Sequence, residues 1–192
     1  MSHPLIQVLS RITSLNELER QAIQAHFPVR SFPKGDFLLK EGEIAHSGYF
    51  IVEGCVREYE LLDGVEQTIE FYTEQQSAAN YHSLSTQTPS KQNLVCLEET
   101  TVAEVNAEQE QQLYRAFPRF ETFCREGMEE MVGKQLALFS RFRRLNPKER
   151  YLSLLVERPA LIQRVPQHQL ASYLGVTPET LSRIRKRVAS QS

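Results

Sequence analysis

The sequence lacks the patterns that indicate a disulfide scaffold, a metal site or an enzyme. Its three cysteines, Cys55, Cys96 and Cys124, are odd in number, widely spaced and free of any C-x-x-C pair. Such a set predicts buried thiols in a reducing compartment. The five histidines form no H-x-H or H-E-x-x-H pattern, and no nucleophile stands beside an evident base. We therefore expect no metal ligands, no catalytic residues and no cofactor.

Long apolar runs and a charged leader are also missing. The first residues, M-S-H-P-L-I-Q, carry no basic cluster ahead of an apolar stretch. No window approaches the roughly 20 apolar residues that a membrane span needs. The composition, 41% hydrophobic and 24% charged, is that of a globular chain with one large domain or two small ones. We expect a cytoplasmic protein that does not contact a membrane.

Acidic and basic residues nearly balance over the whole chain, but they are unevenly distributed along it. The net charge is only -2. From Arg141 onward, however, eleven basic residues stand against three acidic ones, a balance of +8, and the first 140 residues hold eleven basic and twenty-one acidic residues, a balance of -10. An acidic body followed by a basic tail is typical of a nucleic-acid-binding module attached to a non-binding one.

Two short helices about a turn are predicted for the stretch from Gln167 to Arg187. Gly175 supplies the turn, because a left-handed backbone is cheap only without a Cβ. This is the pattern of a helix-turn-helix, and the alternative is an ordinary helical hairpin with a basic, solvated surface. The residues expected to face inward are Leu170, Ala171, Leu174, Leu181 and Ile184.

The second of these helices has a clear start and a polar outer face. Thr177 is a suitable N-cap, Pro178 fits the first helical position, and Glu179 places a carboxylate at the positive end of the helix. Side chains on the outer face can reach base edges and phosphates. They are Glu179, Thr180, Ser182, Arg183, Lys186 and Arg187.

Glycine-punctuated short runs fill the first half of the chain and predict an antiparallel jelly-roll or barrel. Asp63-Gly64 lies between two such runs and is a strong hairpin signal. The polar segment from Ala78 to Asn93 is expected to be a loop with a helical turn, and strands resume at 94–97 and 101–105. The punctuating glycines are Gly35, Gly42, Gly48, Gly54 and Gly64.

A long helix is predicted over 119–145, after Pro118. Its apolar residues fall on a near-heptad seam, and others lie off the seam, so we expect one face on its own domain and one on a second copy of the helix. The alternative is that the stripe only packs on the jelly-roll. The residues assigned to this dimer helix are Phe120, Cys124, Gly127, Met131, Leu138 and Phe142.

These elements divide the chain into three parts, 1–118, the long helix over 119–145, and 146–192. The family resemblance described next implies that the first part is a sensor and the last part a DNA-binding domain. Asn146 and Pro147 predict the start of the next helix at the hinge between the last two parts. Leu161 to Val165 is expected to be a short strand or an extended link. The predicted fold class is therefore α+β.

A jelly-roll, a long central helix and a C-terminal winged helix-turn-helix together resemble the Crp/Fnr family of bacterial transcription regulators. The residues that carry the resemblance are P-K-G-D-F-L-L-K-E-G-E (33–43), Y-F-I-V-E-G-C-V-R-E-Y (49–59) and Y-L-G-V-T-P-E-T-L-S-R-I-R-K (173–186). The resemblance implies a homodimer on a two-fold-related DNA site, with one recognition helix in each half-site and RNA polymerase as a further partner.

Glu179 and Arg183 match the acidic residue and the Arg, four positions later, that the family's recognition helix carries. Arg183 would pair with guanine and Glu179 with cytosine, while Pro178 replaces another base-reading Arg of many members. The base-reading residues are thus expected to be Thr177, Pro178, Glu179, Thr180, Ser182 and Arg183. Those expected to contact phosphates are Gln167, Arg185, Lys186 and Arg187.

The resemblance weakens at the nucleotide pocket. Members that bind a cyclic nucleotide use a G-E-L segment and then an R-S or R-T pair, but here Ala79 and Asn80 stand about where Gly and Glu would. Lys91 is the only cationic residue between Phe71 and Val105, and it replaces a bidentate Arg only as a point charge. Cyclic AMP in its usual pose is not expected, and the effector is left open. The candidate pocket residues are Ala79, Asn80, Tyr81 and Lys91, with a plain polar loop as the alternative.

Two other classes of function remain as alternatives. One is a sensor of a cyclic nucleotide or another small molecule that signals through protein contacts, with the C-terminal helices as a docking module. The other is an enzyme on a cupin-like jelly-roll, which would need clustered histidine and carboxylate ligands that the sequence does not have.

Overall fold

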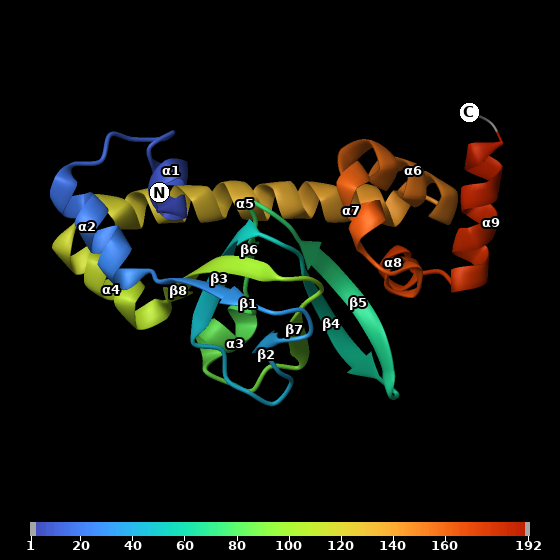
Figure 1. Cartoon of the computed structure of the whole chain (residues 1–192), viewed down its shortest axis with the longest axis horizontal. Helices are drawn as coiled ribbons and strands as arrows, with labels where there is room; N and C mark the ends of the chain where they lie inside the picture. The colour runs from blue at the N-terminus through green and yellow to red at the C-terminus, as the bar shows by residue number, and fades with distance from the viewer. Residues whose placement is uncertain (1–2, 191–192) are drawn as a thin grey trace.

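The computed structural model describes residues 3–190. A single long helix, α5 (Arg119–Arg144), runs along the molecule and carries the β-sheets on one side (Figure 1). The N-terminal helices lie at one end of α5 and the C-terminal helices at the other (Figure 1). The predicted long helix over 119–145 is therefore present, and it connects two groups of elements that are far apart in space.

Two four-stranded antiparallel sheets form the predicted jelly-roll. Their strand orders are β1-β8-β3-β6 and β2-β7-β4-β5. Asp63 and Gly64 both have positive φ, 51° and 79°, as a two-residue hairpin turn requires. The strands are β1 (Val29–Phe32), β2 (Phe37–Leu39), β3 (Ser47–Glu53), β4 (Val56–Leu62), β5 (Val65–Tyr72), β6 (Ser77–Ala78), β7 (Gln92–Cys96) and β8 (Thr100–Asn106).

The sheets enclose an apolar core that includes Ile51, Val56, Leu94 and Val102. A short helix, α3 (Tyr81–Thr86), follows β6, as the sequence predicted for this polar segment. Three helices, α1 (Pro4–Leu9), α2 (Glu17–His26) and α4 (Ala107–Ala116), make a second small core at one end of the molecule.

Phe120 belongs to that second core. It is fully buried against residues such as Ile23 and Leu113, and its ring packs edge-on against Phe117 and Phe123. The prediction that Phe120 lies on a seam facing a second chain is therefore wrong. The apolar residues do recur at a near-heptad spacing, but this spacing does not show whether a residue packs within its own chain or against a second chain.

Phe142, near the other end of α5, also packs within the chain. Its ring lies 5.9 Å from that of Tyr173, and the Arg150 guanidinium lies 4.6 Å from its centroid. Cys124 is half-buried, and Gly127 and Leu138 are exposed. The apolar residues that α5 leaves most exposed are largely off the predicted seam: Met128, Val132, Leu136, Leu138 and Phe139.

Four helices follow α5: α6 (Pro147–Glu157), α7 (Pro159–Arg164), α8 (Gln167–Leu174) and α9 (Pro178–Ala189). The strand or extended link expected at Leu161 to Val165 is instead helix α7 and its C-cap. Pro159 occupies the first turn of that helix and Leu161 is buried, which favours a helix despite the β-branched Ile162. Within residues 3–190 no strand follows Asn106, so the expected wing of the helix-turn-helix is not present.

Candidate nucleic-acid interface

The turn between α8 and α9 forms as the sequence predicted. Gly175 ends α8 with φ +70° and donates its N–H to Ser172 O at 3.0 Å. The five residues expected to face inward are all buried, from fully buried Ala171, Leu174 and Leu181 to Ile184 at 9% exposure. Both helices share one apolar core, which fixes the position of α9 relative to α8.

Helix α9 begins at a side-chain cap. Thr177 Oγ1 accepts a hydrogen bond from Thr180 N at 3.3 Å, and Pro178 occupies the first turn. Backbone hydrogen bonding, Thr177 and Arg183 together hold the pKa of the exposed Glu179 carboxyl below its usual range. Glu179 is therefore a negative acceptor at neutral pH. The Thr177 hydroxyl, in contrast, is already engaged in the cap, which weakens its assignment as a base-reading residue.

One outward face of α9 gathers most of the predicted contact residues. Pro178, Glu179, Ser182, Arg183 and Lys186 line a shallow hollow on this face. The side chains of Arg183, Lys186 and Arg187 form no ion pair with any acidic residue of the described chain, 3–190. Their charges are therefore free to meet an anionic partner.

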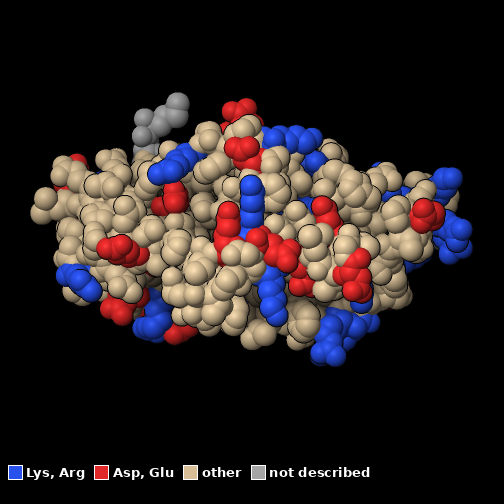
Figure 2. Space-filling view, turned by 90° about the horizontal axis from the view of Figure 1, so that it is seen from below, with Lys and Arg blue, Asp and Glu red and all other residues tan. Residues whose placement is uncertain are grey.

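The other predicted phosphate contacts lie around this face. Gln167, the first residue of α8, is exposed, whereas Arg185 is half-buried beside the inward face of α9. Figure 2 shows basic side chains at the end of the molecule that carries α9, and acidic and basic side chains intermingled over the middle. Basic side chains therefore gather at the end that carries α9, but the rest of this face is mixed in charge.

Arg150 supports this site in a way that sequence reasoning missed. Its Nη1 donates to Leu174 O at 3.1 Å, at the end of α8, and its Nε donates to Leu145 O at 3.1 Å and Phe142 O at 3.2 Å. One guanidinium thereby joins the end of α5 to the turn before α9. The signal was a basic residue in the fourth position after the Asn146 cap, which gave no hint of partners elsewhere in the chain.

The candidate nucleotide pocket is occupied by its own polar side chains. Asn80 is 6% exposed and caps α3, since its Oδ1 accepts from Ser83 N at 2.9 Å. Its Nδ2 donates to Ser90 Oγ at 2.9 Å and to Gln92 Oε1 at 2.7 Å. Ser90 Oγ donates in turn to Gln92 O at 2.7 Å. Asn80 therefore uses both amide N–H donors and its carbonyl oxygen within the protein.

The other candidate pocket residues do not converge on this network. Ala79 is buried, and its Cβ lies 3.4 Å from the position that a Cβ on Gly48 would take. Tyr81 is 41% exposed, with its hydroxyl 3.8 Å from Met131 Sδ on α5, and Lys91 is exposed. These four residues are close in sequence, but the structure does not bring them together as a binding site.

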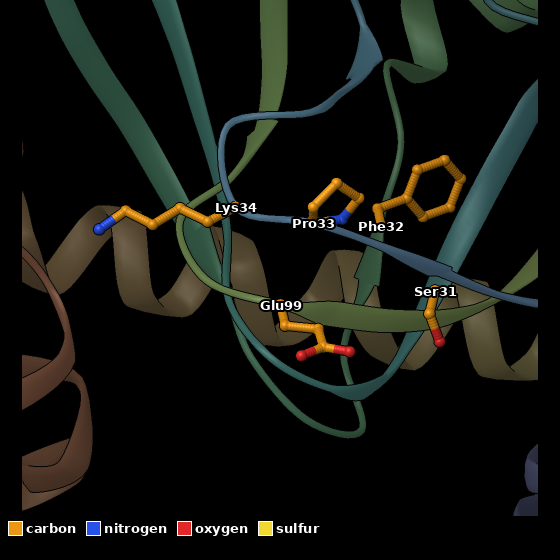
Figure 3. A pocket seen from close by; sticks show the side chains of 5 residues that line it. All are labelled: Ser31, Phe32, Pro33, Lys34 and Glu99. Atoms are coloured by element: carbon orange, nitrogen blue, oxygen red, sulfur yellow. The ribbon is translucent and has the colours of Figure 1, made fainter.

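A second shallow hollow lies near the turns that join β1 to β2 and β7 to β8. It is lined by Ser31, Phe32, Pro33, Lys34 and Glu99. The Lys34 ammonium and the Glu99 carboxylate point in different directions, so no polar groups converge on a bound molecule (Figure 3). This hollow is not a candidate site.

Within residues 3–190 no cluster of three or more His, Cys, Asp and Glu side chains could hold a metal ion. In the same part of the chain, no helix combines the length and the apolar character needed to cross a bilayer.

Comparison with known proteins places the first part of the chain. Residues 29–117 match the model of the cyclic nucleotide-binding domain. This segment spans both sheets, α3 and α4. No curated protein matches the sequence significantly.

Solved structures share the whole architecture at low sequence identity. FixK2 from Bradyrhizobium japonicum is 21% identical with a TM-score of 0.70, covering 86% of this chain and 85% of its own. The c-di-GMP-responsive global regulator CLP of Xanthomonas campestris is 18% identical with a TM-score of 0.68, covering 92% and 93%. A CooA mutant from Carboxydothermus hydrogenoformans is 16% identical with a TM-score of 0.69, covering 100% and 86%.

These matches extend beyond the sensor to the long helix and the C-terminal helices, because they cover at least 86% of the chain. The motif at 33–43 contains β2 and the turns on either side of it, the motif at 49–59 lies on β3 and β4, and the motif at 173–186 lies on the helix-turn-helix. Residues 29–117 are therefore similar to a cyclic nucleotide-binding domain, and over most of its length the chain has the fold of the Crp/Fnr transcription regulators.

Proposed function

We propose that this chain is a sequence-specific DNA-binding transcription regulator that acts as a homodimer and does not respond to cyclic AMP in the usual pose. The observation that carries the proposal is the outward face of α9, where Arg183 and its neighbours are exposed and free of ion pairs. On a helix-turn-helix, that face enters the major groove. Arg183 would donate both guanidinium N–H groups to guanine O6 and N7, and Glu179 would accept from cytosine N4.

The homodimer is supported by the surface of α5. Val132 is 47% exposed, Leu136 is 61% exposed and Phe139 is 60% exposed, although all three are large apolar residues. With Met128 they recur every three or four residues and so share one side of the helix. A second copy of α5 would cover this stripe, and two copies of α9 would then address the two halves of a palindromic site.

Insensitivity to cyclic AMP is supported by the network around Asn80. A cyclic nucleotide needs a cation for its phosphate and an acceptor for its ribose hydroxyl. Here the side-chain amide of Asn80 already donates to Ser90 and Gln92, and the nearest basic residue in sequence, Lys91, lies on the surface. Binding of a nucleotide would break this buried network, and no charge-assisted pair with its phosphate would replace the lost hydrogen bonds.

The first experiment is a selection of bound sequences from a pool of random duplexes, with the purified chain and no added ligand. We expect a palindromic site with half-sites about one helical turn apart. Recovery of no duplex, with or without cyclic AMP and cyclic GMP, would contradict the proposal and favour signalling through protein contacts. Rescue by a nucleotide would instead contradict only the proposed insensitivity.

The homodimer has its own test. Light scattering should give twice the chain mass for the wild type and the single-chain mass for Phe139→Glu, which places a charge in the exposed stripe. Glu126→Gln, on the exposed surface of the same helix, is the matched control and should remain dimeric. A wild type that is monomeric at micromolar concentration would contradict this part of the proposal.

A further inference from the structure

Helix α7 lies where the sequence predicted a short strand or an extended link, and an arginine stands at each of its ends. Arg158 is the residue that precedes α7, and Arg164 is the last residue of the helix. Both side chains leave the helical part of the chain and reach acidic residues of the sensor. They are each about a quarter exposed, at 21% and 24%.

Arg164 holds two sensor carboxylates at once. Its Nη1 and Nη2 donate to the two oxygens of Glu74 at 2.9 and 2.8 Å, which is a bidentate pair. Its Nε also donates to Glu98 Oε1 at 3.1 Å. Glu74 in turn accepts from Gly54 N at 3.0 Å, so the arginine is linked to the backbone of the turn between β3 and β4.

Arg158 makes a second attachment, to strand β5 and the segment that follows it. Its Nη1 donates to Glu70 Oε1 at 2.8 Å, and its Nη2 donates to Phe71 O and, at 3.3 Å, to Gln76 Oε1. The planar fork of an arginine fixes the direction of such bonds, as a lysine would not. Two forks at the two ends of one short helix therefore fix both its position and its rotation on the sensor.

An apolar floor lies beneath these pairs. Cys55 and Phe71 of the sensor are fully buried in the same cluster as Leu161 and Val165 of the α7 segment and the core of the helix-turn-helix. Alongside, Thr68 N on β5 donates to Ser172 Oγ on α8 at 2.9 Å. The recognition helix is thus continuous, through one packed core, with the outer face of the sensor.

We propose that Arg164, assisted by Arg158, is a positioning residue that fixes the orientation of α9 against the sensor of its own protomer. This inference rests on the proposed DNA-binding function. In this arrangement a joint inside each protomer, and not a bound effector, sets the angle at which the recognition helices are presented. The joint and the buried Asn80 network are consistent with each other, because with both in place the orientation of α9 requires no bound nucleotide.

Cys55 offers a native reporter for the joint. It is fully buried under the helical domain, and burial raises the pKa of its thiol to about 12, so it is unreactive while the joint is closed. Cys96 is equally buried, at 1% exposure, but within the sensor core. Opening of the joint exposes Cys55 alone, whereas unfolding of the sensor exposes both.

The test compares the full-length wild type with Arg164→Gln, and uses Arg125→Gln on exposed α5 as the matched control. Alkylation by N-ethylmaleimide, followed by peptide mass spectrometry, gives the rate at each cysteine. We expect Arg164→Gln to raise the rate at Cys55 about fivefold, as loss of partly exposed ion pairs implies, with Cys96 unchanged. An unchanged Cys55, or equal increases at Cys55 and Cys96, would overturn the proposal.

The second readout separates positioning from simple DNA contact. Affinity is measured for the selected palindromic duplex and for a duplex that carries one half-site. A positioning residue affects the simultaneous docking of two helices, so Arg164→Gln should weaken full-site binding several-fold more than half-site binding. Equal losses on both duplexes would overturn the positioning role. If no duplex is selected at all, the proposed function fails, and the cysteine rates still report on the joint.

Discussion

Asn80 in the sensor and Arg183 on α9 both stand where the sequence predicts contact with a ligand, but their surroundings differ. Asn80 is buried and forms hydrogen bonds with Ser83, Ser90 and Gln92. Arg183 is exposed, with no acidic side chain of the described chain within ion-pair distance. A polar residue whose partners lie inside the fold stabilises that fold, and one left without partners is available for binding.

The largest effect is expected at Arg183, the exposed residue of the two, and on DNA affinity. Arg183→Ala should lower specific DNA affinity by about 1–3 kcal/mol in each half-site, hence roughly twice that for the dimer, because a bidentate base contact is lost. Fluorescence anisotropy with the selected duplex would measure this loss.

Arg125→Ala is the control for that variant, since it removes an exposed arginine of α5 that lies far from α9 in sequence. If Arg183→Ala weakened binding to a scrambled duplex by the same factor, Arg183 would be a phosphate contact and not a base-reading residue.

A smaller effect, on stability, is expected when the hydrogen bonds of the buried Asn80 are removed. Asn80→Ala should lower the free energy of unfolding of the sensor by about 1–3 kcal/mol, because Ser83 N, Ser90 and Gln92 lose a buried partner. Urea unfolding followed by circular dichroism measures this change. Ser85→Ala, on the exposed side of the same helix, should have little effect. An Asn80→Ala variant as stable as the wild type would mean that water replaces the amide without cost.

The joint between the two regions predicts a pH dependence. Hydrogen bonds from Arg164 lower the pKa of Glu74 from 4.5 to about 2. A carboxyl with a depressed pKa stabilises the fold above its unfolded pKa, and that contribution is lost as the pH falls from about 4.5 towards 2. Because the Glu74 side chain is 39% exposed, the contribution should be about 1 kcal/mol or less.

The measurement is the difference in unfolding free energy between the wild type and Glu74→Gln at a series of pH values. The difference should be largest near neutral pH and should shrink as Glu74 becomes protonated. A difference that stays constant down to the acid range would show that the ion pair with Arg164 contributes nothing.

No effect at all is expected from cyclic nucleotides. A ligand present at 100 times its dissociation constant and specific for the folded state would stabilise it by about 2.7 kcal/mol. Thermal unfolding with millimolar cyclic AMP or cyclic GMP should show no change in Tm. A clear rise in Tm with either nucleotide would mean that the Asn80 network opens to admit a ligand.

Much of the architecture followed from local patterns. Gly175, the Asp63-Gly64 turn and the Asn146 cap each determine a backbone conformation within a few residues, and all three are found as predicted. The inward residues of the helix-turn-helix were also correct, because one apolar stripe on each helix has only one possible partner across a short turn.

What the sequence could not give depends on partners far along the chain. Phe120 and Val132 are both apolar residues of one helix, and only the fold shows that the first is buried within the chain and the second is not. The bond between Arg164 and Glu74 joins residues 90 apart. Helix α7 was missed for a related reason, since the β-branched Ile162 and Val165 favour a strand, and the burial of Leu161 against the sensor is evident only from the fold.

The contact between Ser172 and Thr68 has a consequence for solubility. Strand β5 lies at the edge of its sheet, and an edge strand with free N–H groups can pair with a strand of another molecule. Helix α8 lies along that strand, and its serine accepts one of those N–H groups. The C-terminal helices therefore also shield the sensor from strand-to-strand aggregation, a protection that would be lost whenever the two parts separate.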